Sequence, residues 1–258
     1  MHADSHDITP TTAPLITIVT VVFNARDRLE RTIKSIIGQD YSNIEYILID
    51  GGSTDGTLDI ISRYSDRIAF WCSEPDKGLY DAMNKGISHA HGNYLWFLNA
   101  GDLIYAPDTI SKIMSTAKDA DIYYGNTLII DIEGRTVGLR RLKPPERLSW
   151  KSLRYGMVVC HQAVIVKRDL VRSFDIRYRF ASDYDWVLKL LKASRHIVNT
   201  GMILAKYLKG GYSSKFIKES LLERFDIMKH NYGFLPTVIY HLVIAVRFMF
   251  FYLRHGWF

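Results

Sequence analysis

Acidic, amide and hydroxyl side chains follow apolar runs at five places along the chain. These places are Asn24, residues 50–57 (DGGSTDGT), residues 73–86 (SEPDKGLYDAMNKG), residues 99–102 (NAGD) and residues 160–186, which contain CHQ and ASDYDW. A carboxylate beside a buried strand is costly unless it meets a hydrogen-bond donor or a cation. The five segments therefore predict a polar ligand site.

The first two segments suit a nucleotide. Asp50 ends an apolar run and can accept a hydrogen bond from an N–H of a base, and Asn24 ends the preceding run. The glycine-rich loop that begins at Gly51 lets the backbone approach a ligand closely. An ordinary tight turn followed by a helix cap explains the same residues, and the loop alone does not decide between the two interpretations.

The third and fourth segments suit a sugar diphosphate. Gly78 begins a helical pattern in which Asp81 and Asn84 lie one turn apart, as a ribose or sugar ring would require, although a solvated helix start is the alternative. Asp102 follows the aromatic run at residues 94–98. A magnesium or manganese ion bridging a diphosphate would supply the cation that this carboxylate needs, whereas a lone aspartate is also a common turn residue.

The fifth segment suits a general base. Asp183 and Asp185 flank Tyr184 at the start of a helical pattern, as expected for a base beside an aromatic platform that binds sugar. The helix dipole alone also stabilises acidic residues in a first turn. His161 on its own is more often a structural histidine than a catalyst.

Apolar runs alternate with helical patterns over most of the chain, which predicts an α/β fold with a mostly parallel sheet and helices on both faces. The expected strands are residues 16–22, 44–49, 68–72, 94–98, 121–130 and 162–166, and the expected helices lie near residues 29–37, 58–64, 79–90 and 109–117. Ligands of such sheets bind at the carboxyl ends of the strands, where the polar segments fall.

The C-terminal part of the chain differs from the rest. Residues 235–253 are largely aliphatic and aromatic but are interrupted by His241 and Arg247. A spanning helix needs about 20 mainly apolar residues without a central arginine, so we expect an amphipathic helix at a membrane surface. A terminal helix packed on the domain or on a dimer partner is the alternative.

We accordingly divide the chain into three parts. A mobile leader occupies residues 1–14, the main domain residues 15–214 with its donor half ending near residue 135, and a C-terminal helical segment residues 215–258. The leader lacks the pattern of a signal peptide.

The composition is that of an ordinary globular protein. Of 258 residues, 48% are hydrophobic and 23% charged, which excludes collagen and disordered chains, and two cysteines are too few for a disulfide scaffold. A reducing, cytoplasmic compartment is therefore expected. The net charge of +6 favours anionic partners. We expect no nucleic acid among them, because only the charge favours it.

Taken together and in this order, the five motifs resemble those of inverting glycosyltransferases of family 2, which have the nucleotide-sugar-binding fold called GT-A. The resemblance covers residues 14–214. The third motif is similar to that of bacterial capsule, O-antigen and colanic-acid transferases, which implies polysaccharide or lipopolysaccharide biosynthesis.

The resemblance implies a role for each motif. Asp50 is similar to the acid that contacts the donor base, Asp102 to the last acid of the metal-binding motif, and Asp183 to the catalytic base, with Asp185 as second candidate. Asn99 and Gly101 stand where acids often occur, so Asp102 is the only carboxylate of that motif. The residues expected at the nucleotide sugar are Asn24, Asp50, Gly52, Ser53, Asp76, Lys77, Asp81, Asn84, Asn99 and Gly101. Those expected at the acceptor or in a closing lid are His161, Tyr184, Trp186, Lys209, Gly211 and Ser213.

The implied reaction is a single displacement. Asp183 takes the proton of an acceptor hydroxyl as its oxygen attacks and inverts the anomeric carbon, and a nucleoside diphosphate leaves, stabilised by Mn²⁺ or Mg²⁺. The implied acceptor is a lipid-linked saccharide at the inner face of the cell membrane, and a homodimer is a further expected partner state.

Three other functions compete with this interpretation. A non-catalytic nucleotide- or glycan-binding module would not need both Asp50 and Asp183. A nucleotidyltransferase would cluster further acids near Asp102. A dehydrogenase would carry a G-x-G-x-x-G motif after the first apolar run, where this chain has none.

Overall fold

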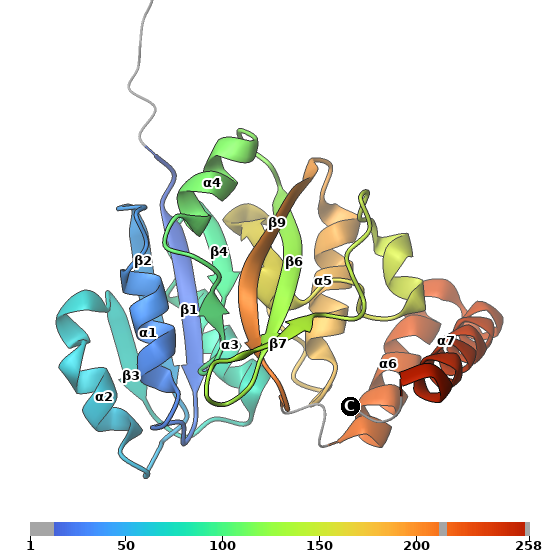
Figure 1. Ribbon diagram of the computed structural model, residues 1–258, viewed down its shortest axis with the longest axis horizontal. Coiled ribbons are helices and arrows are strands. Elements are labelled where there is room, and N and C mark those ends of the chain that lie inside the picture. Colours follow the sequence, from blue (N-terminus) through green and yellow to red (C-terminus); the bar gives the residue numbers. More distant parts are fainter. Residues whose placement is uncertain (1–12, 212–215, 256–258) are drawn as a thin grey trace, which may run out of the picture.

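The computed structural model describes residues 13–211 and 216–255, which form a mixed sheet with helices on both faces (Figure 1). The strands are β1 (Ile16–Val22), β2 (Ile44–Asp50), β3 (Phe70–Ser73), β4 (Tyr94–Phe97), β5 (Leu103–Ile104), β6 (Ile122–Ile130), β7 (Thr136–Leu139), β8 (Val164–Lys167) and β9 (Ile197–Leu208). The α-helices are α1 (Leu29–Ile37), α2 (Thr57–Arg63), α3 (Leu79–Ser88), α4 (Thr109–Thr116), α5 (Ser182–Ala193), α6 (Ile217–Tyr232) and α7 (Phe234–His255). Short 3₁₀ turns are η1 (Ser65–Arg67), η2 (Trp150–Tyr155), η3 (His161–Ala163) and η4 (Arg168–Leu170).

The predicted α/β fold class is confirmed, and the order of the sheet is β3-β2-β1-β4-β8-β6-β9-β5, with β7 beside β6. Strands β3, β2, β1 and β4 run parallel, as expected. Beyond β4 the sheet is mixed, because β8 is antiparallel to β4 and β6 while β9 is parallel to β6. The carboxyl ends of β1, β2 and β4 therefore meet at one edge, which is where the polar loops lie.

Both faces of the sheet are covered, which explains why β1 is β-branched and almost wholly apolar, with Thr17 and Thr20 as its polar residues. Val19 and Val21 pack into the core beneath α3 and α5. Ile16 and Ile18, which point the other way, pack into the core beneath α1, α2 and α4. Strand β1 is buried at every residue.

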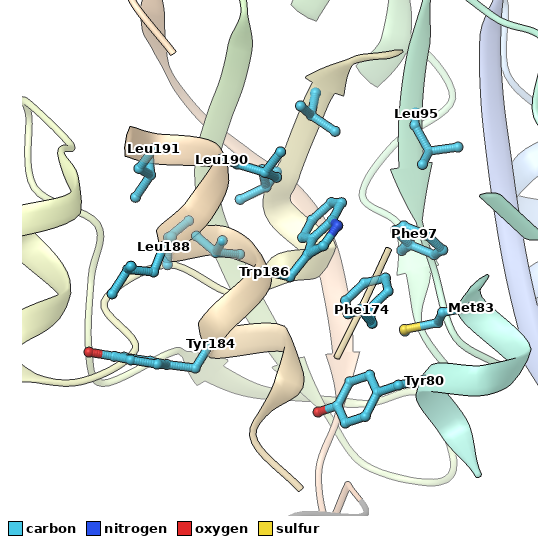
Figure 2. Packing of buried hydrophobic residues seen from close by; sticks show 14 of the residues in the cluster. Tyr80, Met83, Leu95, Phe97, Phe174, Tyr184, Trp186, Leu188, Leu190 and Leu191 are labelled. Atoms are coloured by element: carbon cyan, nitrogen blue, oxygen red, sulfur yellow. The ribbon is translucent and has the colours of Figure 1, made fainter. Parts of the chain in front are cut away.

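Two aromatic residues expected at an acceptor platform are core residues instead. Trp186 is 2% exposed and packs against Phe97 and Phe174, with ring centroids 5.6 and 4.8 Å away (Figure 2). Tyr184 is wholly buried, and its hydroxyl donates to the carbonyl oxygen of Leu153 at 2.9 Å. The expectation that Tyr184 and Trp186 lie at the acceptor or in a closing lid is wrong for their rings, because both rings are buried in the core.

Helices α6 and α7 pair with each other beyond α5, on the side of the molecule away from β2 and β3 (Figure 1). By length and composition, residues Phe234–Phe251 of α7 would be able to cross a membrane, since their mean hydropathy is 1.8. The core helix of a soluble protein can pass the same test, but such a helix is mostly buried. Only 6% of this stretch is buried.

Candidate active site

Asp50 organises the loops that follow β1, β2 and β3. Its carboxylate is wholly buried, and one oxygen accepts hydrogen bonds from the backbone N–H groups of Gly52 and Ser53 at 3.1 and 2.9 Å and from the Ser73 hydroxyl at 2.6 Å. The other oxygen accepts from the Ser53 hydroxyl at 2.5 Å. Both oxygens are turned into the loop, so the structure gives Asp50 a positioning role where the sequence analysis expects a contact to the base.

Asn24 joins the β1 loop to the β2 loop. Its backbone has a φ of 45°, in the left-handed region that asparagine tolerates better than most residues. The side-chain oxygen accepts from the N–H of Thr54 at 2.9 Å, and the backbone N–H donates to Ser53 Oγ at 2.8 Å. The side chain of Asn24 is exposed at this edge of the sheet.

Asp76 lies directly over the β2 loop. A Cβ added to Gly51 would stand 2.7 Å from Asp76 Oδ2, so the carboxylate fills the space beside this glycine. Lys85 Nζ holds Asp76 at 2.6 Å and Glu74 at 2.8 Å. Burial raises the pKa of Asp76, and the hydrogen bond and charge of Lys85 oppose that effect. Lys77 beside it is exposed.

The polar residues of α3 mostly bond to protein. Asp81 accepts from the backbone N–H of Lys77 at 2.9 Å. Asn84 pairs with the backbone of Phe174, donating to its carbonyl oxygen at 2.9 Å and accepting from its N–H at 2.7 Å. The structure thus gives Asn84 a structural role, holding residue 174 against α3, where a sugar contact was expected.

The η3 turn connects two carboxylates that are 81 residues apart in sequence. Gln162 Nε2 donates to Asp102 Oδ2 at 2.9 Å, and His161 Nδ1 lies 3.2 Å from Asp183 Oδ2. The turn itself is fixed to β4, because Trp96 Nε1 donates to the carbonyl oxygen of Gln162 at 2.7 Å. Consecutive residues of one turn therefore place the predicted metal ligand and the predicted base in a single site.

Asp183 is the carboxylate of this site that remains partly accessible, with 25% of its side chain exposed. Tyr80 Oη donates to its Oδ1 at 3.1 Å. Burial disfavours the anion, but the hydrogen bond and charge of His161, the charge of Arg224 and the hydrogen bond from Tyr80 outweigh burial and lower the pKa of Asp183. The group is therefore ionised at neutral pH and able to accept a proton.

Asp185 points elsewhere. It is 4% exposed and forms an ion pair with Lys189 of the next turn at 2.5 Å. Residues two apart on a helix lie about 200° around its axis from each other, so α5 presents only one of the two acids to the site. That acid is Asp183.

Asp102 is 4% exposed, and among the described residues no lysine or arginine forms an ion pair with it. Burial raises its pKa to about 6, although the N–H of Leu208, at 3.0 Å, and Gln162 stabilise the anion. The side-chain oxygen of Asn99, in the same turn, is buried and has no hydrogen-bond partner within the described ranges. Two oxygen donors thus lie in one turn, and magnesium or manganese is commonly held by one or two carboxylates together with substrate phosphates.

The described part of the chain contains no cluster of three histidine, cysteine or acidic side chains. A cation here would therefore depend on the diphosphate and on water for most of its ligands. The residues present fit a metal bound together with the donor.

The end of β9 packs on the turn that carries Asp102. A Cβ at Gly101, where φ is +106°, would stand 2.7 Å from Leu208, so close packing requires this glycine. Gly211 lies against the hydroxyl of Tyr207, and Lys209 is exposed. Ser213, which the sequence analysis assigns to a lid, lies outside the described residues.

The sequence analysis missed Tyr80 and Gln162 as site residues. Both stand inside quoted motifs, next to Asp81 and His161, but nothing local shows that their side chains reach Asp183 and Asp102. It also missed Glu223 and Arg224, which reach the site from α6.

The model of the family described as Glycosyl transferase family 2 matches residues 17–174 of the chain. An uncharacterized glycosyltransferase of Mycobacterium tuberculosis is 37% identical over 188 residues, which are 69% of this chain and 70% of that protein.

Two solved structures have a similar fold. Residues 1–349 of Staphylococcus aureus TarS, in complex with UDP-GlcNAc, superpose with a TM-score of 0.64 at 17% identity, covering 83% of this chain and 64% of that one. The mannosyltransferase PcManGT of Pyrobaculum calidifontis, in complex with GDP-Man and Mn²⁺, gives 0.61 at 17% identity, covering 92% and 76%.

Proposed function

The chain belongs to glycosyl transferase family 2 and is a glycosyltransferase, and on that premise we propose that it transfers a sugar from a nucleoside-diphosphate sugar to an acceptor hydroxyl with inversion. The observation that carries the proposal is the joining of Asp183 and Asp102 through the η3 turn. The reaction requires a base that takes the proton of the acceptor hydroxyl and a carboxylate near the donor diphosphate. The η3 turn contacts the residues that we assign to both roles.

Asp183 is the general base of the proposed reaction. As the acceptor oxygen bonds to the anomeric carbon, its proton passes to Asp183, and the bond from that carbon to the diphosphate oxygen breaks. Tyr80 and His161 fix the orientation of the carboxylate during this transfer. A positioned base of this kind contributes about 10²- to 10⁴-fold to the rate.

In this proposal Asp102 and Asn99 would hold a divalent cation together with the donor diphosphate. A bound Mn²⁺ or Mg²⁺ supplies charge stabilisation for the leaving diphosphate. A cation also relieves the cost of burying Asp102 without an ion-pair partner, which the raised pKa reflects. The similar mannosyltransferase structure is a complex with GDP-Man and Mn²⁺, which supports this assignment.

The proposed catalytic base is tested by replacing Asp183, and the nucleotide of the donor is tested by comparing two donors. Water takes the place of the acceptor, and release of nucleoside diphosphate from UDP-GlcNAc or GDP-mannose is measured. We expect Asp183→Asn to lower kcat by about 10²-fold or more, and Asp185→Asn, the matched change on the same helix, to stay within about threefold of the parent. Full activity of Asp183→Asn would refute the proposed base.

Donor binding has its own test, which does not depend on the acceptor. UDP, GDP and dTDP are screened by thermal shift with and without Mn²⁺, because a ligand that binds the native state raises its melting temperature. We expect one nucleotide to stabilise the protein, more so with Mn²⁺, and Asp102→Ala to lose the increment due to metal. Absence of any shift at millimolar nucleotide contradicts the proposal.

We further propose that α7 rests on the inner face of the cell membrane, where the acceptor is a lipid-linked saccharide of surface polysaccharide synthesis. Two polar residues of α7 face the protein: Thr237 is wholly buried, and His241 packs on Phe225 with ring centroids 5.0 Å apart. The apolar side of α7 faces outward, with Leu242 62% and Met249 51% exposed. A soluble helix shows the opposite arrangement.

Arginines border this apolar surface. Arg141 lies 4.9 Å over the ring of Phe251, and burial together with the charges of Arg247 and Arg140 lowers the pKa of Arg141. Cations gathered beside an exposed apolar helix are suited to anionic headgroups.

The membrane proposal is tested by flotation with vesicles of phosphatidylglycerol and phosphatidylcholine. We expect the double variant Leu242→Glu and Met249→Glu to lower binding at least tenfold, because each carboxylate opposes burial of that face. Val137→Glu, at a 52% exposed site on β7, is the control. The membrane proposal is refuted if the parent protein does not bind vesicles. If the parent then forms a dimer and the double variant is a monomer, α7 packs against a second copy of the chain instead.

A further inference from the structure

The carboxylate of Glu223, in α6, accepts hydrogen bonds from the backbone immediately before α5, the helix that carries Asp183. One of its carboxylate oxygens accepts from the backbone N–H of Arg179 at 2.8 Å. The other accepts from Phe180 at 2.8 Å and from Ala181 at 2.9 Å. Three successive N–H groups thus converge on a single side chain more than 40 residues later in the sequence.

The N-cap residue of α5 does not cap the helix with its own side chain. Its N-cap residue is Ala181, which makes no side-chain cap hydrogen bond. Backbone N–H groups at a helix start need partners, and a negative charge there is favoured by the helix dipole. Glu223 supplies, from another helix, the negative charge and a partner for the N–H of the N-cap residue Ala181. Asp183 is the second residue of α5, so the direction of its side chain follows from where this turn begins.

A second contact ties the same loop to α6. Tyr178 Oη donates to Asp226 Oδ2 at 3.0 Å, three residues further along α6 from Glu223. Helix α6 is itself anchored in the core by Ile227 and Met228, which are 1% and 0% exposed. The loop before α5 therefore rests on a fixed support.

The residue after Glu223 also lies close to the first turn of α5. The Arg224 guanidinium lies 5.5 Å over the ring of Tyr184, the neighbour of Asp183, and its charge contributes to the lowered pKa of Asp183. Consecutive residues of α6 thus act on the base in two ways, one through the backbone and one through charge.

We propose that Glu223 is a positioning residue for Asp183, so that α6 belongs to the active site although it follows the donor-binding fold in sequence. The inference rests on the proposed role of Asp183 as base. Glu223 itself touches neither donor nor acceptor. It holds the first turn of α5 at the place where Asp183 meets Tyr80 and His161.

The test is a double-mutant cycle on the full chain, with nucleoside diphosphate release from UDP-GlcNAc or GDP-mannose as readout. We expect Glu223→Ala to lower kcat by about 10- to 100-fold, since a displacement of about 1 Å at a reacting group costs that much. The KM for the donor is expected to stay within twofold, because among the described residues no hydrogen bond or ion pair joins α6 to the loops around Asp50. Glu219→Gln, an exposed position on the same helix, is the control.

The combined variant decides whether the effect passes through the base. We expect Asp183→Asn with Glu223→Ala to be no slower than Asp183→Asn alone, because a residue that acts only through Asp183 loses its effect when that base is gone. Multiplied losses would overturn the proposal, as would a Glu223→Ala variant that is as active as the control or that loses donor affinity together with kcat. Glu223→Gln, which retains one acceptor oxygen, replaces Glu223→Ala if the latter does not fold, with a smaller loss in kcat expected.

The same cycle separates this inference from the proposed function. If Asp183→Asn is as active as the parent, the assignment of the base fails. If Asp183→Asn is slow but Glu223→Ala is not, only the positioning role fails.

Discussion

Replacing Asp102 by asparagine should stabilise the ligand-free protein at neutral pH while abolishing the proposed metal-assisted sugar transfer. The carboxylate is 4% exposed, and burial raises its pKa from 3.8 to about 6 despite two hydrogen bonds. A folded-state pKa about two above that of the unfolded chain corresponds to about 3 kcal/mol of lost stability once the group is ionised in both states.

The direction in which the free energy of unfolding changes with pH follows from which state, folded or unfolded, holds the proton. Below about pH 4, Asp102 is protonated in both the folded and the unfolded chain, and burial of the neutral acid costs no charge. Between about pH 4 and 6 the folded protein retains a proton that the unfolded chain has lost, so raising the pH lowers the free energy of unfolding. Above about pH 6 the cost is constant at about 3 kcal/mol. Asparagine is neutral throughout.

The assay is urea unfolding of the parent and Asp102→Asn between pH 4 and 7.5, in buffer with a chelator. We expect the variant to gain about 3 kcal/mol relative to the parent as the pH rises from 4 to 7. The amide replaces one of the two accepted hydrogen bonds poorly, which shifts the difference by a constant but does not change its slope. Asp66→Asn, at an exposed aspartate, corrects for the general loss of a carboxylate.

A difference between parent and Asp102→Asn that does not vary with pH would refute this reasoning. It would mean that the ionised carboxylate is as well stabilised inside the protein as in water. Addition of Mn²⁺ with the nucleotide found by thermal shift should reverse the order of stability, because the cation pairs with the carboxylate of the parent alone.

Three further predictions concern other parts of the site. Asp50→Ala should cost about 3 kcal/mol or more in urea unfolding, because it leaves buried donors of the loop without an acceptor; a loss under 1 kcal/mol would contradict the positioning role. Gly86→Ala should destabilise the protein by about 1–3 kcal/mol, since the added methyl group collides with the side chain of Val19 in the core. An unchanged midpoint of urea unfolding would show that the core rearranges to accept the methyl group. Tyr80→Phe should keep the melting temperature within a few degrees but lower kcat about tenfold, because Asp183 loses a hydrogen bond worth about 1.5 kcal/mol; unchanged kcat would remove Tyr80 from the site.

Local patterns were sufficient to predict most regular elements of the first half of the chain, although the two-residue strand β5 was not expected. Strand β1 begins and ends where its β-branched run does, and α3 begins at Leu79 directly after Gly78. Strand β9 was missed because its pattern is interrupted at Gly201 and most of its residues are only half-buried. The C-terminal helical segment was expected, but its division into α6 and α7 at Gly233 was not.

In the site, as in the fold, local sequence patterns predict some features and contacts between distant parts of the chain decide the others. The sequence alone determined the family and the edge of the sheet at which polar residues gather, because these depend on motifs and on the ends of apolar runs. It also named the carboxylates Asp50, Asp102 and Asp183 as candidate site residues, and the roles of Asp102 and Asp183 stay predictions. It gave Asp183 as the base with Asp185 as second candidate, and it placed Trp186 at the acceptor or in a lid. Only the tertiary structure shows that Trp186 fills the core and that Asp185 pairs with Lys189.

The contacts that turn these carboxylates into a site come from distant parts of the chain. Gln162 reaches Asp102 across 60 positions, and Glu223 reaches the start of α5 across more than 40. Spacing within a motif determines which residues share a strand end or a helix face, since backbone geometry repeats locally. Which side chain meets which carboxylate depends on how separate elements pack, and that packing is a property of the whole chain rather than of any segment of it.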